Sequence, residues 1–260
     1  MPGSAATWTS CPLPCRGATL RLFCIPYAGA GASVFRDWPD EMTPEIEVWP
    51  VHVPGRERRL GEPPMRSIRS LAAGAAAGLA PHLDQPYAIF GHSMGALIGF
   101  ELARALRRSR QRPPQALLVS GFGGPHLTSR RSPIHPLADE QFKDAVRALN
   151  GTPSDVIAND ELMDLLLPLL RADFQAVETY SHSEEPPFEV PIFVYSGRDD
   201  FETPEEDLAE WSRHTSAECR VTLFEGDHFY LRRCGPALRR QVRSDLLELG
   251  ARPLPRDKDN

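Results

Sequence analysis

The feature that most constrains how this chain can fold is a regular alternation of short apolar runs with longer helical stretches. The apolar runs have the length and content of buried strands, and they cover residues 18–26, 46–54, 87–92, 116–122, 191–197 and 219–226. The helical stretches between them cover residues 33–38, 67–83, 96–109 and 205–214. This alternation favours βαβ units and therefore predicts an α/β protein, with a mostly parallel central sheet and helices on both faces.

One interval departs from the alternation, because residues 124–187 contain no convincing strand. Its helix-like runs cover residues 138–150, 159–170 and 171–182, and Pro168 is expected to break or kink the second from the third. We expect a helical lid over the carboxyl edge of the sheet, where ligands bind in such folds. The alternative is that these helices only extend the domain. Six apolar residues fit both interpretations: Leu162, Met163, Leu165, Leu166, Leu169 and Leu170.

The length of 260 residues suits one large α/β domain. We expect a core of about residues 17–124 and 187–250, a helical lid of about 125–186, and flexible tails at 1–16 and 251–260.

Composition narrows the possible partners and the compartment. A formal net charge of −6 argues against nucleic acid or an anionic membrane as the main partner. The N-terminus lacks the features of a signal peptide and no apolar stretch is long enough to span a membrane, so a cytoplasmic location is expected. Cys11 and Cys15 have no neighbouring ligands that would complete a zinc site, and the five cysteines are expected to be reduced.

The most informative motif is Gly91-His92-Ser93-Met94-Gly95, a G-x-S-x-G pentapeptide between a predicted strand and a predicted helix. A nucleophile elbow requires this strand–turn–helix setting. A strained turn that lifts a serine hydroxyl leaves no room for side chains beside it, which explains the two glycines. Ser93 is therefore the candidate nucleophile.

A serine nucleophile needs a base, and the base needs an acid that orients it. Among eight histidines, His228 follows a predicted strand near the chain end, whereas His92 lies in the elbow itself and should point away from the nucleophile. The acid should follow a strand between Ser93 and His228. Asp199 and Asp200 both follow the run 191–197, and only one of them can face the imidazole.

Two backbone amides are candidates for an oxyanion hole. The first predicted strand leads into the small-residue loop Tyr27-Ala28-Gly29-Ala30-Gly31, and a helix begins at Met94. We assign the donors to the amides of Ala28 and Met94. The loop does not fit a dinucleotide site, because G-x-G-x-x-G is absent and no acidic ribose ligand ends the next strand.

Over residues 20–246 the chain resembles the type II thioesterases that accompany modular polyketide synthases and non-ribosomal peptide synthetases. The motifs that carry the resemblance are CIPYAGAGASVFRDW, VPGRERRLGEPP, FGHSMGALIGFELA, the segment LNGTPSDVIANDELMDLLLPLLRADFQAVETY, GRDD, Trp211 and GDHFYL. The resemblance implies an α/β-hydrolase fold and a triad at Ser93, Asp200 and His228, which favours Asp200 over Asp199. It also implies hydrolysis of acyl groups from the phosphopantetheine arm of acyl or peptidyl carrier domains.

Such a reaction implies no metal and no cofactor of its own, because phosphopantetheine arrives as part of the substrate. Three arginines near one loop, Arg56, Arg58 and Arg59, are candidates to meet the acidic face of a carrier domain or are simply solvated. Three alternative functions remain: a general carboxylesterase on the same fold, an acyltransferase that also carries G-H-S-x-G, and a non-catalytic carrier-binding protein.

Overall fold

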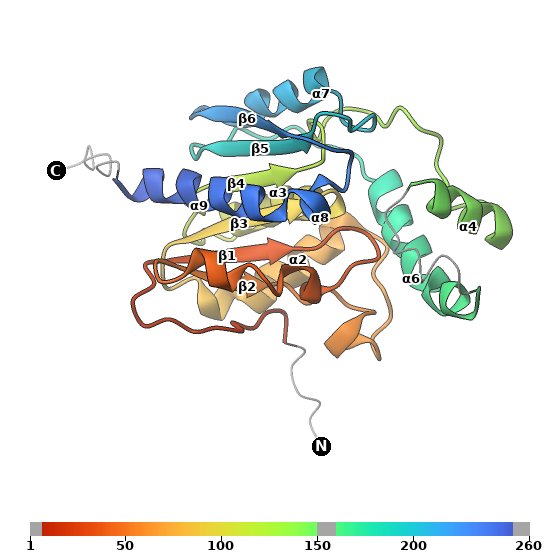
Figure 1. Ribbon diagram of the computed structural model, residues 1–260, viewed down its shortest axis with the longest axis horizontal. Helices are drawn as coiled ribbons and strands as arrows, with labels where there is room; N and C mark the ends of the chain where they lie inside the picture. The colour runs from red at the N-terminus through yellow and green to blue at the C-terminus, as the bar shows by residue number, and fades with distance from the viewer. Residues whose placement is uncertain (1–6, 150–159, 252–260) are drawn as a thin grey trace.

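The six apolar runs form the six strands of a single sheet in a computed structural model that describes residues 7–149 and 160–251 (Figure 1). The strands, in chain order, are β1 (Leu20–Ile25), β2 (Ile46–Pro50), β3 (Tyr87–His92), β4 (Leu117–Ser120), β5 (Ile192–Gly197) and β6 (Cys219–Phe224). Their order across the sheet is β2-β1-β3-β4-β5-β6, and each neighbouring pair is parallel. The predicted α/β class is confirmed.

Helices cover both faces of the sheet, as the alternation predicts. One face carries α2 (Ile68–Leu79), α3 (Met94–Arg108) and residues of α7 (Glu205–Ala209). The other face carries α1 (Pro39–Met42), α8 (Tyr230–Arg233) and α9 (Gly235–Ala251), with α9 lying in front of the sheet in Figure 1. Single 3-10 turns lie at Ala32–Phe35, Glu57–Arg59, Ala80–His82 and Glu210–His214.

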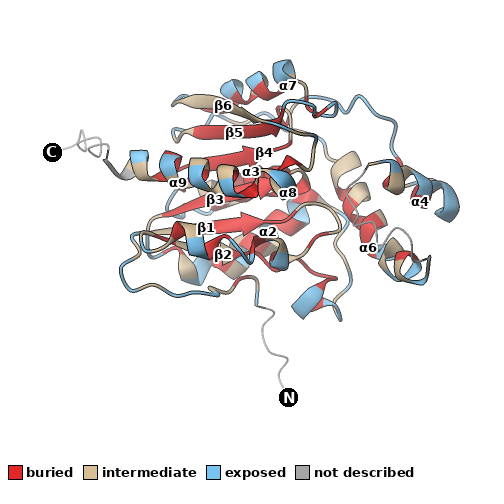
Figure 2. Ribbon diagram, viewed as in Figure 1, coloured by how far each residue is buried: buried red, intermediate tan, exposed pale blue. Residues whose placement is uncertain are grey.

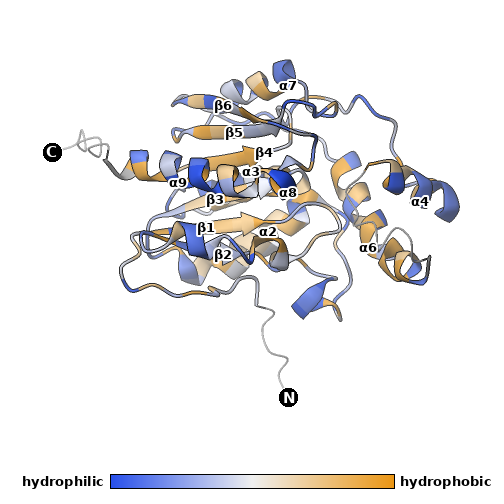
Figure 3. Ribbon diagram, viewed as in Figure 1, coloured by the Kyte–Doolittle hydropathy of each residue, from blue (hydrophilic) through white to orange (hydrophobic). Residues whose placement is uncertain are grey.

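The side chains of each strand alternate between the two helix layers. In β1, Phe23 and Ile25 pack in the cluster that contains α2 and α3, whereas Leu22 and Cys24 pack in the cluster that contains α9. Successive side chains of a strand point to opposite faces, so a strand covered on both sides must be apolar throughout. Figure 2 shows β1, β3, β4 and β5 buried along much of their length and the edge strand β6 only partly buried, and Figure 3 shows apolar colour on much of the central strands.

Residues 8 and 9, which were expected to belong to a flexible tail of residues 1–16, pack against the rest of the protein. Thr9 forms an antiparallel bridge with Val51, and its hydroxyl donates to the Pro50 carbonyl over 2.9 Å. The Trp8 ring packs against two glycines of α2, and the Arg59 guanidinium lies 4.2 Å from its centroid. Small residues on α2 leave space for the indole, so residues 8 and 9 belong to the packed body of the protein. Residues 1–6 and 252–260 lie outside the described part of the chain.

The strand order reverses direction at β1, because β2 lies on one side of it and β3 on the other. The connections after β1 and β3 therefore leave toward opposite faces of the sheet: α1 lies in one helix layer and α3 in the other. Such a topological switch point opens a crevice at the carboxyl ends of the strands. The loop 27–31 and the turn at Ser93 meet there.

Two helices of the segment between β4 and β5 lie beyond the carboxyl ends of the strands (Figure 1). They are α4 (Asp139–Ala148) and α6 (Asp160–Glu178); we call residues 125–186 the helical insertion. Of the break or kink expected at Pro168, the break does not occur, because α6 continues through this residue as one helix. Burial of Met163, Leu169 and Leu170 on both sides of the proline holds the helix in place despite the lost hydrogen bond. Residues 150–159, which end the first expected run and begin the second, lie outside the described residues.

Among the described residues, no helix is long and apolar enough to cross a membrane.

Replacing Pro168 by Ala is expected to stabilise the protein by up to about 3 kcal/mol, because an interior proline has no amide donor and its ring clashes with the carbonyl one turn earlier. Pro168 is exposed, so the change removes no core packing. Urea unfolding measures the difference. The matched control is Leu165→Ala on the same helix, where the side chain is 71% exposed and the change should stay within about 0.5 kcal/mol. A Pro168→Ala variant less stable than the wild type would contradict this explanation.

Candidate active site

Ser93 makes the sharp turn between β3 and α3 by itself, since β3 ends at His92 and α3 begins at Met94. Its φ of 53° and ψ of −120° lie in a region that residues other than glycine rarely adopt. Its amide donates to the Ser120 carbonyl over 2.7 Å, which ties the turn to β4. Ser93 lines a cavity of about 720 Å³, as a nucleophile elbow requires.

The two glycines of the pentapeptide are required by direct backbone contacts. A Cβ atom at Gly91 would lie 2.1 Å from the Gly95 carbonyl oxygen. A Cβ atom at Gly95 would lie 2.2 Å from the Ile25 carbonyl oxygen at the end of β1. Backbone atoms cannot move aside as a flexible side chain can, so no larger residue fits at either position without rearrangement.

His228 and Asp200 form the pair that the sequence predicts at the ends of β6 and β5. The Nδ1 atom of His228 lies 2.8 Å from Oδ2 of Asp200, whose side chain is fully buried. Asp199 is exposed and uses its amide to donate to the Gly226 carbonyl, so Asp200 is the aspartate that faces the imidazole. The two loops are pressed together at Gly197, where a Cβ atom would lie 2.2 Å from the Gly226 oxygen.

The surroundings of Asp200 keep its carboxylate ionised. Burial has the largest single effect and raises the pKa, but the hydrogen bond and charge of His228 oppose it together with two further donors. The Thr203 hydroxyl donates to Oδ2 over 2.6 Å and the Glu202 amide to Oδ1 over 3.0 Å. Together these contacts lower the pKa of Asp200 to about 2. The anion can therefore orient His228 and favour its protonated form during a proton transfer.

His92 packs against His228 and does not line the cavity, in agreement with the prediction that it points away from Ser93. The two ring centroids are 5.1 Å apart. Nδ1 of His92 lies 2.8 Å from the Ser120 hydroxyl, which lies 2.7 Å from the Tyr230 hydroxyl. Burial, together with the positive charge of a protonated His228, lowers the pKa of His92, which keeps this supporting ring neutral.

Ser93 and His228 line the same cavity, although these two described residues do not hydrogen-bond to each other. Contacts of this kind are often long before substrate binds and tighten in the complex.

The loop after β1 carries one of the predicted oxyanion donors. The Ala30 amide donates to the Tyr27 carbonyl over 3.0 Å, and Gly29 has a φ of +77°, so residues 27–30 form a tight turn. Ala28 and Met94 both line the cavity beside Ser93. Within the described chain, neither of their amides donates a hydrogen bond to another residue. Both amides are thus available to a negatively charged oxygen.

Two of the three arginines considered for carrier contact are buried and already engaged, so their assignment to an exposed docking loop is wrong. Arg56 makes two hydrogen bonds to Asp173 of α6, of 2.8 and 2.7 Å. Arg59 makes two hydrogen bonds to Glu62 and a third to the His52 carbonyl. Arg58 alone of the three is exposed.

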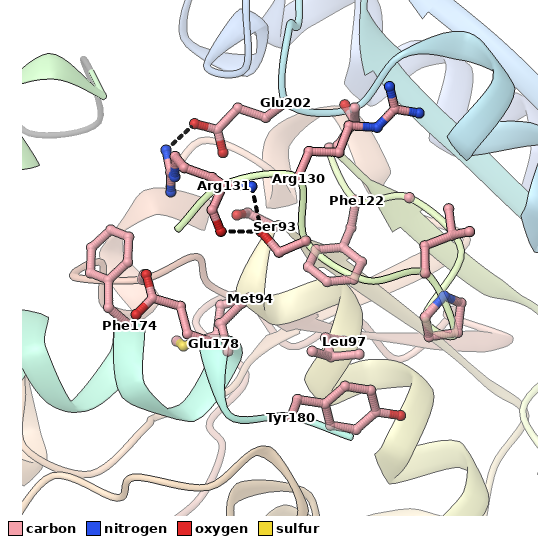
Figure 4. Close-up of a pocket in the computed structure, with 18 of the residues that line it drawn as sticks. Ser93, Met94, Leu97, Phe122, Arg130, Arg131, Phe174, Glu178, Tyr180 and Glu202 are labelled. Carbon is pink, nitrogen blue, oxygen red and sulfur yellow. Dashed lines mark hydrogen bonds and ion pairs between the residues drawn. The ribbon is translucent and has the colours of Figure 1, made fainter. Parts of the chain in front are cut away.

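The cavity beside Ser93 has a volume of about 720 Å³ and is walled by both the sheet edge and the helical insertion. Figure 4 shows Met94, Leu97 and Tyr180 on one side of Ser93, and Arg130, Arg131 and Glu202 on the other. The apolar part of the wall also includes Phe122, Val146, Leu149, Leu170, Phe174 and Val177. Apart from Glu178, which Figure 4 shows beside Met94, one side of the cavity is apolar and can accept an apolar group, whereas the opposite rim is charged.

Three histidines are in ring contact with one another, and two of them, His126 and His182, line the cavity. His126 and His214 are joined by a 2.8 Å hydrogen bond, and His126 also contacts Glu210 over 3.0 Å. His182 accepts a hydrogen bond from Arg104 over 3.1 Å. In the part of the chain that the structure describes, no three His, Cys, Asp or Glu side chains are placed so that they could hold a metal ion.

A strained serine, an imidazole paired with a buried carboxylate and two available amides are the parts of an acyl-transfer site. Comparison with known proteins agrees with this chemistry, since the thioesterase domain model matches residues 20–245. The chain belongs to the thioesterase family.

Relatives of this thioesterase include the gramicidin S biosynthesis protein GrsT of Aneurinibacillus migulanus, which is 43% identical over 82% of this chain and 84% of its own. RedJ, a thioesterase from the prodiginine biosynthetic pathway in Streptomyces coelicolor, superposes with a TM-score of 0.84 at 34% identity, covering 94% of this chain and 96% of that one. BorB, the type II thioesterase of the borrelidin biosynthetic cluster, gives a TM-score of 0.85 at 32% identity, covering 94% and 99%. These likenesses confirm the α/β-hydrolase fold and the predicted resemblance to type II thioesterases.

The sequence did not reveal one contact of this thioesterase site. Asp173 accepts a hydrogen bond from the Gly29 amide over 2.7 Å, which ties the helical insertion to the loop after β1. The two residues are 144 positions apart, and Asp173 stands in a helical run without any motif that marks it. The nearest signal is the small-residue pattern of the loop, which indicates a close backbone approach but not the partner.

Replacing Gly95 by Ala is expected to destabilise the fold by at least about 1–3 kcal/mol, because the new methyl group would overlap the Ile25 carbonyl group. Thermal and urea unfolding measure the loss. Gly61→Ala is the matched control: a Cβ atom there has no neighbour within 4 Å, so stability should change by less than about 0.5 kcal/mol. Equal stability of both variants would mean that the elbow does not depend on this contact.

Proposed function

We propose that this thioesterase hydrolyses acyl groups from the phosphopantetheine arm of acyl or peptidyl carrier domains, as an editing enzyme in polyketide or non-ribosomal peptide biosynthesis. The observation that carries the proposal is the convergence of Ser93, His228 and Asp200 at the carboxyl ends of β3, β6 and β5. Asp200 and His228 are 28 positions apart in the chain (228 − 200), and Ser93 and His228 are 135 positions apart (228 − 93). The three residue types together form a nucleophile, its base and the acid that orients the base.

In the proposed mechanism, His228 removes the hydroxyl proton of Ser93 while Asp200 holds the imidazole through Nδ1. The Ser93 oxygen attacks the thioester carbonyl, and the carbonyl oxygen becomes an oxyanion. When the tetrahedral intermediate collapses, the carbon–sulfur bond breaks and the thiol leaves with the proton from His228. A water molecule, deprotonated by His228, then hydrolyses the acyl-enzyme and regenerates Ser93.

The Ala28 and Met94 amides are the proposed donors to the oxyanion. Met94 begins α3, so its amide belongs to the helix end that carries partial positive charge. The loss of one such donor lowers the rate about 100- to 1000-fold in enzymes of this kind. We propose no metal and no resident cofactor for this reaction, because the charge on the oxygen is met by backbone amides and phosphopantetheine enters as part of the substrate.

Carrier domains are the proposed partners because of what the relatives do and because of the shape of the site. GrsT and RedJ belong to gramicidin S and prodiginine biosynthesis. A cavity of about 720 Å³ with one apolar side is large enough for an acyl chain beside Ser93. The family match favours a thioester substrate over the simple carboxylester of the alternative function.

The decisive experiment offers a panel of acyl-loaded carrier domains and simple carboxylesters to the enzyme and follows unloading by mass spectrometry. We expect the wild type to unload carriers and the Ser93→Ala variant to be inactive, since the attacking oxygen is missing. The variant should fold normally, which circular dichroism checks. Preference for the simple esters would support the carboxylesterase instead. Unchanged turnover by Ser93→Ala would exclude Ser93 as the nucleophile.

The choice between the two aspartates has its own test. Asp200→Asn is expected to lower kcat by about 10⁴-fold, because the amide cannot hold His228 in the right tautomer. The neighbouring Asp199→Asn is the matched control and should retain kcat within about twofold, since the Asp199 side chain is exposed. Steady-state rates with one acyl-carrier substrate measure both. Comparable losses in the two variants would remove the distinction drawn from the geometry.

A further inference from the structure

A buried ion pair joins the helical insertion to the loop after β2. Arg56 and Asp173 are 5% and 0% exposed and make two parallel hydrogen bonds, from Nη1 to Oδ2 over 2.8 Å and from Nη2 to Oδ1 over 2.7 Å. This planar, doubly bonded geometry fixes both side chains in direction as well as in distance. Neither partner lines the cavity, so neither touches the substrate.

Both members of the pair also bind the backbone of the same turn. The Gly29 amide donates to Oδ2 of Asp173 over 2.7 Å, and Nη1 of Arg56 donates to the Ala30 carbonyl over 3.0 Å. Gly29 and Ala30 directly follow Ala28, and the 3.0 Å hydrogen bond from Ala30 to Tyr27 closes the turn around it. The direction of the Ala28 amide is therefore set by a turn that the ion pair holds from outside.

Helix α6 touches this turn a second time, one helical turn before Asp173. A Cβ atom at Gly29 would lie 2.6 Å from Cδ2 of Leu170, so the Leu170 side chain packs directly on the Gly29 backbone. Residues 170 and 173 lie on one face of the helix, at a spacing of three. Leu170 packs against the Gly29 backbone, and the charged carboxylate of Asp173 accepts a hydrogen bond from the amide of the same residue.

We propose that Asp173 is a positioning residue for the oxyanion hole: through Arg56 and the Gly29 amide it holds the Ala28 amide in the direction that stabilises the oxyanion. This inference rests on the proposed function, in which Ala28 donates to the oxyanion. The oxyanion hole is then completed by the helical insertion and is not a property of the sheet and its loops alone. A donor that is misdirected loses part of its effect in the transition state, where the charge develops, and little in the ground state.

The test compares Asp173→Asn with a matched control, Asp245→Asn. Asp245 is also a buried carboxylate, paired with Arg220 over 3.1 Å and hydrogen-bonded to Tyr195 over 2.6 Å, but it lies on α9 away from the cavity. With an acyl N-acetylcysteamine thioester, we expect Asp173→Asn to lower kcat at least about 10-fold and to leave KM within about twofold. Asp245→Asn should leave both constants within about twofold at a temperature where it is folded.

A second measurement separates positioning from general loss of structure. A trifluoromethyl ketone analogue of the substrate forms a tetrahedral adduct with the serine, and its oxyanion occupies the same hole. Its inhibition constant should rise in Asp173→Asn by about the same factor as kcat/KM falls. An unchanged kcat, a change confined to KM, or an equal loss of kcat in Asp245→Asn would each overturn the proposal.

If Asp173→Asn does not fold, Arg56→Lys provides the same test with the charge retained. Lysine keeps a positive charge near Asp173 but cannot make the two parallel bonds and the bond to Ala30 together. It should lower kcat and weaken the trifluoromethyl ketone by a common factor; normal kcat in this folded variant would overturn the proposal. A wild-type protein inactive on every thioester would instead refute the proposed function, so the two failures are distinguishable.

Discussion

Where β3 turns into α3, the backbone of Gly95 lies against the carbonyl group of Ile25 at the end of β1, with no space for a methyl group between them. This contact between two backbones brings the start of α3 beside the loop that follows β1. The strand order makes it possible, because β1 and β3 are neighbours whose connections depart toward opposite helix layers. Ser93, Met94 and Ala28 share one cavity as a direct result.

A second set of contacts at the same edge of the sheet places the base and its acid. The loops after β5 and β6 approach closely at Gly197 and Gly226, so Asp200 and His228 face each other. Asp200 is fully enclosed and satisfied by the Thr203 hydroxyl and the Glu202 amide as well as by the imidazole. An acceptor held on several sides does not reorganise when its partner gains a proton, which is the condition for efficient electrostatic stabilisation.

Much of this arrangement was readable from the sequence, because it follows from local patterns. The central strands β3, β4 and β5 are buried on both faces and must be apolar along their whole length, so they were visible as runs. The edge strands β2 and β6 are only partly buried but keep enough apolar residues to read as runs as well. The turn at Ser93 was predicted from the two glycines of the pentapeptide, Gly91 and Gly95. At Pro168 the low helix propensity of proline indicated a break between two helices. Packing of Met163 and Leu170 on either side of it keeps α6 continuous instead. Arg56 was placed on an exposed loop for a similar reason, since its partner Asp173 lies 117 positions away in the chain.

The contact between Gly29 and Asp173 could not be predicted, since no periodicity or motif links two residues 144 positions apart. This contact has a consequence for chimaeras in which one thioesterase receives the helical insertion of another. Suppose that a helical insertion is transplanted from a relative in order to alter acyl preference. It would bring that relative's residues at positions 170 and 173, whereas the rest of the chain would keep Arg56 and Gly29. A working chimaera therefore has to match the residues on both sides of this buried contact. These contacts matter more than the points where the helices join the strands.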